Sequence, residues 1–307
     1  MAFLEAHDIV KDYSGHRALD GLNLSVEEGG VYGLLGPNGA GKTTFIRIVN
    51  QITKPDSGEI IFDGHKLCPA DIERIGYLPE ERGLYKKMKV GEQAVFLAQL
   101  KGLSKHDAIV KLKVWFEKFG IEQWWNKKVE ELSKGMQQKV QFIVTVLHEP
   151  QLLIFDEPFS GFDPVNANIL KNEIMELKKK GATVLFSTHN MSSVEEVCDS
   201  ITLINKSKAV LNGSVWDVKQ QYKDNTFNIK FNGDASFFSS ADSRVIMSDI
   251  QPMRDYTSAV IKPREVISAN ELIRYMLEHV DLVGFEEKLP SMNDIFLKVV
   301  GSNEVEK

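Results

Sequence analysis

The glycine-rich segment GPNGAGKT, Gly36–Thr43, has the residue types and spacing needed to hold a phosphate. It fits the pattern G-x-x-x-x-G-K-[ST] and lies between an apolar segment, GVYGLLG, and a predicted helix that begins at KTT. Glycines allow backbone N–H groups to close around phosphate oxygens, and a helix N-terminus adds the positive end of its dipole. A glycine-rich turn with a chance Lys-Thr pair is the alternative, but it does not explain this strand–helix context.

Within this segment, the side chains of Lys42 and Thr43 have distinct expected roles. We expect the Lys42 ammonium to reach the β- and γ-phosphates of a nucleotide and the Thr43 hydroxyl to ligate Mg²⁺. The predicted nucleotide-contacting residues of this segment are Gly36, Pro37, Asn38, Gly39, Ala40, Gly41, Lys42, Thr43 and Thr44.

A pair of acids follows a second apolar segment, LLIFDE, Leu152–Glu157. If this segment is a strand of the same parallel sheet, it places Asp156 at the edge where the phosphate-binding loop lies. Asp156 is then expected to hold Mg²⁺ through water, and Glu157 to polarise the attacking water as a general base. A strand end followed by two surface acids is the alternative. The pattern is weak by itself and becomes informative downstream of the phosphate-binding loop.

The elements that must position these residues alternate between strands and helices. Apolar strand interiors predict a mainly parallel sheet covered on both faces, with half-exposed strands before residue 30 that form an antiparallel β subdomain. Residues 85–150 read as a helical subdomain, in which Ser104 and Asp107 form a capping pair and Gly120 ends a helix. The aromatic residues Trp115, Phe116, Trp124 and Trp125 are expected to pack in its core.

A change in the sequence pattern near residue 222, from long apolar strands and helices to short alternating strands, predicts a second domain. Short alternating strands, a capping pair at Ser268 and Glu271, and a last helix from Ser291 indicate a small α+β domain at 222–307, after a first domain at 1–221. This division agrees with the usual domain size of roughly 100–200 residues.

Composition excludes several classes of protein. The net charge of −6 does not favour nucleic acid or an anionic membrane surface as a partner. The N-terminus has no signal-peptide pattern, and no apolar run is long enough to span a bilayer. The two cysteines, Cys68 and Cys198, form neither a disulfide framework nor a paired metal-binding spacing, which fits a reducing cytoplasm. Both are expected to be small buried apolar residues.

A third motif, ELSKGMQQK at Glu131–Lys139, resembles the signature of ATP-binding-cassette (ABC) ATPases, usually L-S-G-G-Q. Ser133 and Gly135 are kept, while Lys134 replaces the first Gly and Met136 replaces the Gln. A serine at a helix N-terminus suits a γ-phosphate. In that family, the phosphate belongs to the nucleotide on the opposing subunit. An ordinary serine N-cap is the alternative.

The resemblance covers roughly residues 1–220 and implies further site residues. Tyr13 lies where the family has an aromatic residue that stacks on adenine, or it is a packing residue at a strand edge. SGFDP, with Asp163, resembles the loop that reaches across the dimer interface, and Asp163 is also a good N-cap. His189 resembles the switch histidine that contacts the γ-phosphate, although a lone histidine at a strand end is more often structural.

The segment RIGYLPEERGLY carries a departure from the family pattern at Glu80. The family has a Gln at this place, which touches Mg²⁺ and links the nucleotide to the membrane-facing surface. A carboxylate keeps an oxygen for the metal, loses the amide donor and adds negative charge near the triphosphate. A solvated loop acid is the alternative. The resemblance thus implies Thr43, Glu80 and Asp156 as the Mg²⁺ residues.

Three functional classes contain a phosphate-binding loop of this kind: GTPases or kinases, soluble ABC ATPases, and ATPase subunits of transporters. A GTPase lacks support because the chain has the signature and no N-K-x-D pattern, and a kinase also fails on the signature. A soluble ABC ATPase in translation or DNA repair usually has two cassettes or a long coiled coil, and the chain has one phosphate-binding loop and no sustained heptads. The resemblance therefore implies an ATP-hydrolysing transporter subunit with ATP and Mg²⁺ as cofactors. The soluble ABC ATPase stays the alternative.

The resemblance also implies partners and a place in the cell. We expect a head-to-tail homodimer that works with a separate membrane permease at the inner face of the cell membrane, without inserting into the bilayer itself. The C-terminal domain is similar to that of bacterial sodium-extruding ABC ATPases, and LPSMNDIFLKVVG resembles the end of that domain. Export is therefore the expected direction of transport.

Overall fold

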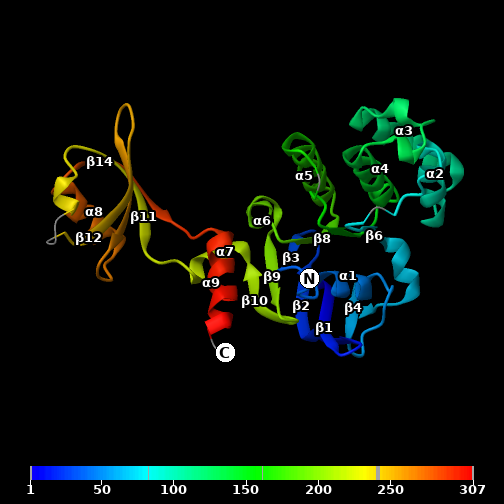
Figure 1. The fold of residues 1–307 in the computed structure, drawn as a ribbon, viewed down its shortest axis with the longest axis horizontal. Coiled ribbons are helices and arrows are strands. Elements are labelled where there is room, and N and C mark those ends of the chain that lie inside the picture. Colours follow the sequence, from blue (N-terminus) through cyan, green and yellow to red (C-terminus); the bar gives the residue numbers. More distant parts are fainter. Residues whose placement is uncertain (1, 82, 161, 240–242, 306–307) are drawn as a thin grey trace. The chain divides into compact units, whose positions relative to one another are not determined.

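The computed structural model describes residues 2–81, 83–160, 162–239 and 243–305. Internal contacts divide the chain into two units, Met1–Val215 and Trp216–Lys307, and each is described by itself. Figure 1 traces their elements along the chain. The domain limits 1–221 and 222–307 stay a prediction.

A six-stranded sheet forms the centre of the first unit, with the strand order β10-β9-β3-β8-β7-β6. Its strands are β3 (Val31–Leu35), β6 (Ile75–Leu78), β7 (Leu152–Asp156), β8 (Thr183–Thr188), β9 (Ser200–Asn205) and β10 (Lys208–Ser214). All neighbours from β9 to β6 are parallel, and β10 joins β9 antiparallel. The carboxyl ends of β3, β6, β7 and β8 therefore share one edge, which is where ligands bind in sheets of this kind.

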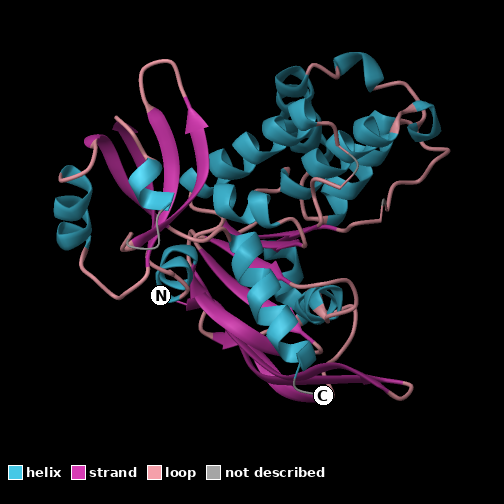
Figure 2. Ribbon diagram, turned by 60° about the vertical axis from the view of Figure 1, so that its left-hand side comes forward, coloured by secondary structure: helices cyan, strands magenta, loops and turns pink. Residues whose placement is uncertain are grey.

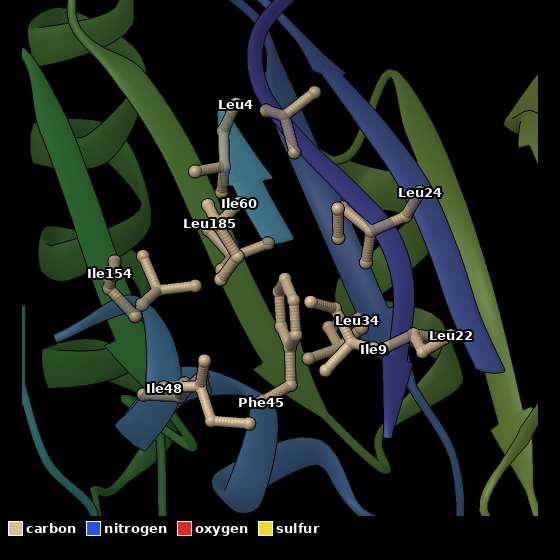
Figure 3. Close-up of a cluster of buried hydrophobic side chains, with 14 of the residues drawn as sticks. Leu4, Ile9, Leu22, Leu24, Leu34, Phe45, Ile48, Ile60, Ile154 and Leu185 are labelled. Carbon is tan, nitrogen blue, oxygen red and sulfur yellow. The ribbon is translucent and has the colours of Figure 1, made fainter. Parts of the chain in front are cut away.

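An antiparallel sheet packs against the central one across helix α1 (Lys42–Val49). Its strands are β1 (Ala2–Tyr13), β2 (His16–Glu27), β4 (Ser57–Phe62) and β5 (His65–Lys66), in the order β2-β1-β4-β5. Figure 3 shows Phe45 of α1 beside Ile9 of β1 and Leu34 of β3, all fully buried. This shared apolar cluster fixes the start of α1, and with it the phosphate-binding loop, against the sheet.

The predicted helical region gathers on one side of the central sheet (Figure 2). It contains α2 (Val90–Leu100), α3 (Lys105–Phe119), α4 (Lys134–Val146) and the short 3₁₀ turns η2 (Glu122–Trp124) and η3 (Val129–Glu131). The Ser104 hydroxyl accepts a hydrogen bond from Asp107 N at the start of α3, and Gly120 ends that helix with φ 63°. Phe116 and Trp124 are buried there, and Trp115 and Trp125 pack against them partly buried.

Two more helices follow the central strands: α5 (Pro164–Lys179) after β7 and α6 (Met191–Val197) after β8. Asp163 caps α5 with its carboxylate, and Pro164 occupies the first turn, as the Asp-Pro pair predicts. The ring of Phe142 in α4 stacks on Phe155 in β7 with centroids 5.7 Å apart. This contact ties the helical region to the strand that ends in Asp156.

The second unit is an antiparallel sheet with helices. The elements of this part of the chain are α7 (Val215–Gln221), β11 (Thr226–Asn232), η4 (Ser236–Ser239), β12 (Val245–Pro252), β13 (Thr257–Pro263), α8 (Ala269–Leu277), β14 (Asp281–Lys288) and α9 (Met292–Val305). The strand order is β12-β13-β11-β14. Ser268 and Glu271 form the predicted capping box of α8, whose Leu272 and Met276 are buried against the strands.

The predicted fold class is confirmed: a mainly parallel core sheet, an antiparallel β subdomain, a helical subdomain and a C-terminal α+β domain. One local expectation is wrong. Cys198 is buried, but Cys68 is partly exposed because it lies in the extended segment that precedes the 3₁₀ segment η1 (Pro69–Arg74), outside the apolar core. Among the described residues, no helix is both long and apolar enough to cross a membrane.

Candidate nucleotide-binding and hydrolysis site

The turn after β3 depends on two glycines that no other residue can replace without rearrangement. Gly36 has φ 148°, and a Cβ there would lie 2.2 Å from the carbonyl oxygen of Ile204. Gly41 has φ 117°, and its Cβ would lie 2.4 Å from the carbonyl oxygen of Ala18. Because both backbones approach a neighbouring strand this closely, a side chain at either position would displace the loop.

Lys42 is buried at the first position of α1. Its Nζ donates hydrogen bonds to the carbonyl oxygens of Gly36, at 2.7 Å, and Pro37, at 3.2 Å. Burial lowers the pKa of Lys42, and the negative charges of Glu157, Asp156 and Glu80 partly oppose that effect. A buried ammonium held by neutral carbonyls has no anion in direct contact, so a phosphate is well suited to pair with it.

Asp156 is buried at the end of β7, with 2% of its surface exposed. Its Oδ2 accepts a hydrogen bond from Thr43 Oγ1 at 3.2 Å, and its Oδ1 accepts one from Ser187 Oγ on β8. Ser187 is fully buried and was not foreseen as a site residue, although a serine inside the apolar strand VLFSTH is a usable signal. The two hydroxyls fix the carboxylate between α1 and β8.

Glu157 has an unusual backbone that directs its side chain into the same site. Its φ is 49°, and its N–H donates to the carbonyl oxygen of Ser187 at 3.1 Å. The carboxylate accepts hydrogen bonds from Thr188 Oγ1 at 3.3 Å and from Nδ1 of His189 at 2.7 Å. Left-handed backbone costs a non-glycine residue free energy and is common where function requires it.

A pocket of about 410 Å³ opens over these groups. It is lined by Tyr13, His16, Ala18, Asn38, Gly39, Gly41, Lys42, Thr43, Thr44, Glu80, Asp156 and Glu157. Tyr13 is 41% exposed, which leaves its ring accessible to a planar ligand, and the Lys11 ammonium lies 5.4 Å from the ring centroid. His16 and Ala18 were missed because β2 carries no motif; only its pairing with β1 brings them to the pocket.

Glu80, two residues beyond β6, lies on the wall of this pocket and is exposed to solvent. Its charge acts on two groups of the site. It opposes part of the lowering of the Lys42 pKa that burial causes, and it adds a small increase to the pKa of Tyr77, which burial and then Asp156 raise to about 12. The structure therefore places this carboxylate beside the predicted nucleotide contacts.

Seven predicted residues are not part of the pocket lining: Gly36, Pro37 and Ala40 of the loop, His189 beside Glu157, and the more distant Ser133, Gly135 and Asp163. Ser133 is the exposed N-cap of α4, where its Oγ accepts a hydrogen bond from Met136 N. Gly135 lies in the first turn of the same helix, and a Cβ there would come no closer than 3.9 Å to another residue, Phe162. Asp163 is the exposed N-cap of α5. Among the described residues, the pocket does not bring these three groups to the phosphate-binding loop.

The donor set of the pocket fits Mg²⁺. Mg²⁺ prefers oxygen ligands and keeps several waters, with one or two carboxylates from the protein. Thr43 Oγ1 and Asp156 Oδ2 already lie 3.2 Å apart, and the Glu80 carboxylate lines the same pocket.

A phosphate-binding loop at the carboxyl edge of a parallel sheet, with a buried aspartate on a strand of that sheet, defines a P-loop nucleoside triphosphatase. A family model described as "ABC transporter" matches residues 19–160. A second model, described as "ATP-binding protein DrrA1-3-like, C-terminal domain", matches residues 213–300.

The chain is similar to named relatives over nearly all of its length. The ABC transporter ATP-binding protein YhaQ of Bacillus subtilis (strain 168) is 40% identical over 294 residues, which cover 96% of this chain and 97% of YhaQ. The linearmycin resistance ATP-binding protein LnrL of the same organism is 28% identical over 307 residues, covering 97% and 98%. A solved structure, titled "Structure of ATP binding subunit of ABC transporter", has a TM-score of 0.67 and 31% identity and covers 72% of this chain and 93% of that one.

The chain belongs to the family of ABC transporter ATP-binding proteins. This membership confirms the expected class of enzyme, an ABC ATPase, and the expected cofactor, ATP. Proteins of this family work with permease partners.

Proposed function

We propose that this chain hydrolyses ATP with Mg²⁺ as one of two cassettes arranged head to tail, and that it drives export through a separate membrane permease. One observation carries the catalytic part. The Glu157 carboxylate accepts hydrogen bonds from Thr188 and His189, and it lines the same pocket as Lys42. A restrained carboxylate facing a bound phosphate chain is the arrangement that a general base needs.

The residues of the pocket divide the work between binding and proton transfer. Lys42 and the backbone N–H groups of the loop hold the β- and γ-phosphates, and Tyr13 stacks on the adenine. Thr43, Asp156 and Glu80 are the residues that would hold Mg²⁺, which when bound neutralises charge on the phosphates. Glu157 accepts the proton of the attacking water at its carboxylate. His189 orients that carboxylate and contacts the γ-phosphate.

The head-to-tail dimer is supported by where Ser133, Gly135 and Asp163 lie. All three belong to exposed helix starts outside the pocket, and the α4 N-terminus presents N–H groups that suit a phosphate. A second copy, turned by a two-fold axis, offers these groups to the nucleotide of the first. Because closure buries the nucleotide between both chains, ATP favours the closed dimer by binding it better than the open one.

Export through a permease is supported by the length of the similarity to LnrL. That relative is named for linearmycin resistance, and its match includes the C-terminal domain as well as the cassette. Removal of a toxic compound is the simplest basis for resistance. We place this chain at the cytoplasmic face of the membrane, held there by the permease. A net charge of −6 offers no electrostatic footprint for nucleic acid.

Purification of the complex from native membranes tests this proposal. We expect a permease to copurify with the wild-type chain, and inside-out vesicles that contain the complex to accumulate a substrate only with ATP and Mg²⁺. The Glu157→Gln chain should keep the permease and lose the transport. A chain that copurifies with ribosomal or DNA-repair proteins and no permease would support the soluble ABC ATPase instead.

A further inference from the structure

Outside the nucleotide site, three potential metal ligands gather in a stretch of seven residues. His65 lies on β5, Cys68 precedes η1, and Asp71 lies within η1, so the ligands follow a regular H-x₂-C-x₂-D spacing. One ligand atom from each residue lies within 4.8 Å of the other two. We propose that His65, Cys68 and Asp71 form a binding site for a thiophilic divalent cation of the Zn²⁺ class.

The carboxylate of Asp71 is the fixed member of this site. Its side chain is 5% exposed, and its Oδ2 accepts a hydrogen bond from Cys68 N at 2.9 Å. The backbone N–H of Asp71 donates in return to the carbonyl oxygen of Cys68 at 3.0 Å, and the Cys68 sulfur lies within 4.8 Å of the carboxylate. The carboxylate is therefore preorganised.

Both ring nitrogens of His65 face oxygen acceptors. Nδ1 lies 3.3 Å from the carbonyl oxygen of Asp63, and Nε2 lies 3.0 and 3.1 Å from the two oxygens of Asp71. A neutral imidazole carries one N–H and can donate to only one of these two partners. With the proton on Nε2 the ring donates to Asp71, whereas a cation bound between Nε2 and Asp71 leaves the proton for the Asp63 carbonyl.

Four features favour a cation over the proton. A carbonyl that holds the distal ring nitrogen is the usual outer partner of a metal-bound histidine. Imidazole, thiolate and carboxylate are the ligand types of Zn²⁺, and three protein ligands leave one position open. One Cys68 thiolate and one Asp71 carboxylate neutralise a divalent ion. The His65 side chain is 47% exposed, so an ion can enter from solvent.

Arg74 borders the site. Its Nη1 forms an ion pair with Asp71 Oδ1 at 3.5 Å, and its other donors bind Asp63 and Gln151. The site lies between two structural elements. It joins the end of the antiparallel sheet to η1, which continues directly into β6 and so toward Glu80. A bound ion would brace this connection, and the proposal does not depend on the proposed export function.

Metal binding to the full-length reduced chain, freed of metal by a chelator, tests the proposal. We expect one Zn²⁺ per chain by equilibrium dialysis, and a thiolate-to-metal charge-transfer band with Co²⁺. Cys68→Ser should abolish the band, and Cys68→Ser and His65→Gln should each weaken Zn²⁺ binding by about 100-fold or more, because even loss of an outer partner costs 10–100-fold. His7→Gln, a change at an exposed histidine of the same sheet, is the control and should bind like wild type.

Two results would overturn the proposal. Equal Zn²⁺ affinity in wild type, Cys68→Ser and His65→Gln would mean an adventitious ion only. Absence of stoichiometric Zn²⁺ binding to the wild-type chain would show that the three residues form a hydrogen-bonded cluster without a metal. Neither readout requires ATP turnover, so each is separate from the test of the proposed function.

Discussion

Nδ1 of His189 lies 2.7 Å from Oε1 of Glu157, at the ends of the adjacent parallel strands β8 and β7. The contact joins the proposed switch histidine directly to the proposed general base. Thr188, the residue before His189, donates to the other carboxylate oxygen. Both carboxylate oxygens of Glu157 are thus held by residues at the end of β8. A shift of β8 would therefore move the carboxylate.

Glu157→Gln should keep ATP binding and slow hydrolysis by about 100-fold or more, because an amide cannot accept the proton of water. Steady-state phosphate release and a separate nucleotide-binding titration measure the two effects. Glu196→Gln is the matched control, since Glu196 is an exposed acid on α6 that pairs with Lys171. Wild-type turnover in Glu157→Gln would remove Glu157 from the role of base.

Ser187→Ala should raise the Mg²⁺ concentration needed for half-maximal ATPase activity by about tenfold or more. The change removes one of the two hydroxyls that hold the buried Asp156 carboxylate, and a hydrogen bond to a charged group contributes about 1.5–3 kcal/mol. Ser193→Ala, at another buried serine, controls for loss of packing. If the Mg²⁺ requirement of Ser187→Ala matches that of Ser193→Ala, Ser187 does not position the metal ligand.

Glu80→Gln should alter the Mg²⁺ dependence and the ATPase rate, because it removes a negative charge from the pocket wall and adds an amide donor. Activity measured across Mg²⁺ concentrations at fixed ATP reports the change. Glu81→Gln removes a neighbouring loop charge and is the control. Identical curves for wild type and both variants would return Glu80 to the status of a solvated loop acid.

His148 should make folding stability depend on pH. Burial, and then the charge of Lys101, lower its pKa from 6.5 to about 4, and Lys111 adds a smaller effect in the same direction. Between pH 6.5 and pH 4, His148 binds a proton in the unfolded chain but stays neutral in the folded chain. The free energy of unfolding therefore falls as pH falls through this range. From about pH 7 to about pH 5 the loss is roughly 2 kcal/mol.

Urea unfolding of the wild-type chain and of His148→Phe at both pH values measures this contribution. The phenyl ring keeps most of the packing and cannot titrate, so the variant should lose about 2 kcal/mol less than wild type over this interval. Equal losses in the two chains would show that His148 does not carry the pH dependence.

Much of the architecture follows from local sequence signals. Ser104 with Asp107, Asp163 with Pro164, and Ser268 with Glu271 each begin a helix where the capping pattern predicts, because a cap acts within one turn. The apolar runs before Gly36 and Glu157 were recognisable as buried strands because parallel strands covered on both faces have continuous apolar sequences. In the structure both are parallel neighbours of β8.

What could not be predicted depends on contacts between distant segments. Ser187 gains its role from Asp156 on the next strand, and His16 reaches the pocket only through the pairing of β2 with β1. Cys68 was expected to be buried because sequence gives no sign of the extended segment that exposes it. The cluster with His65 and Asp71 was missed for the same reason, since a single cysteine has no paired spacing.

The arrangement of two cassettes around ATP is tested most directly by the mass of the Glu157→Gln chain in solution. Sedimentation velocity with ATP and Mg²⁺ should show a dimer, and without nucleotide a monomer. Adding Ser133→Arg to this variant should leave ATP binding intact and prevent dimer formation. A Glu157→Gln chain that binds ATP and stays monomeric, or a dimer that is indifferent to Ser133→Arg, would contradict the head-to-tail arrangement.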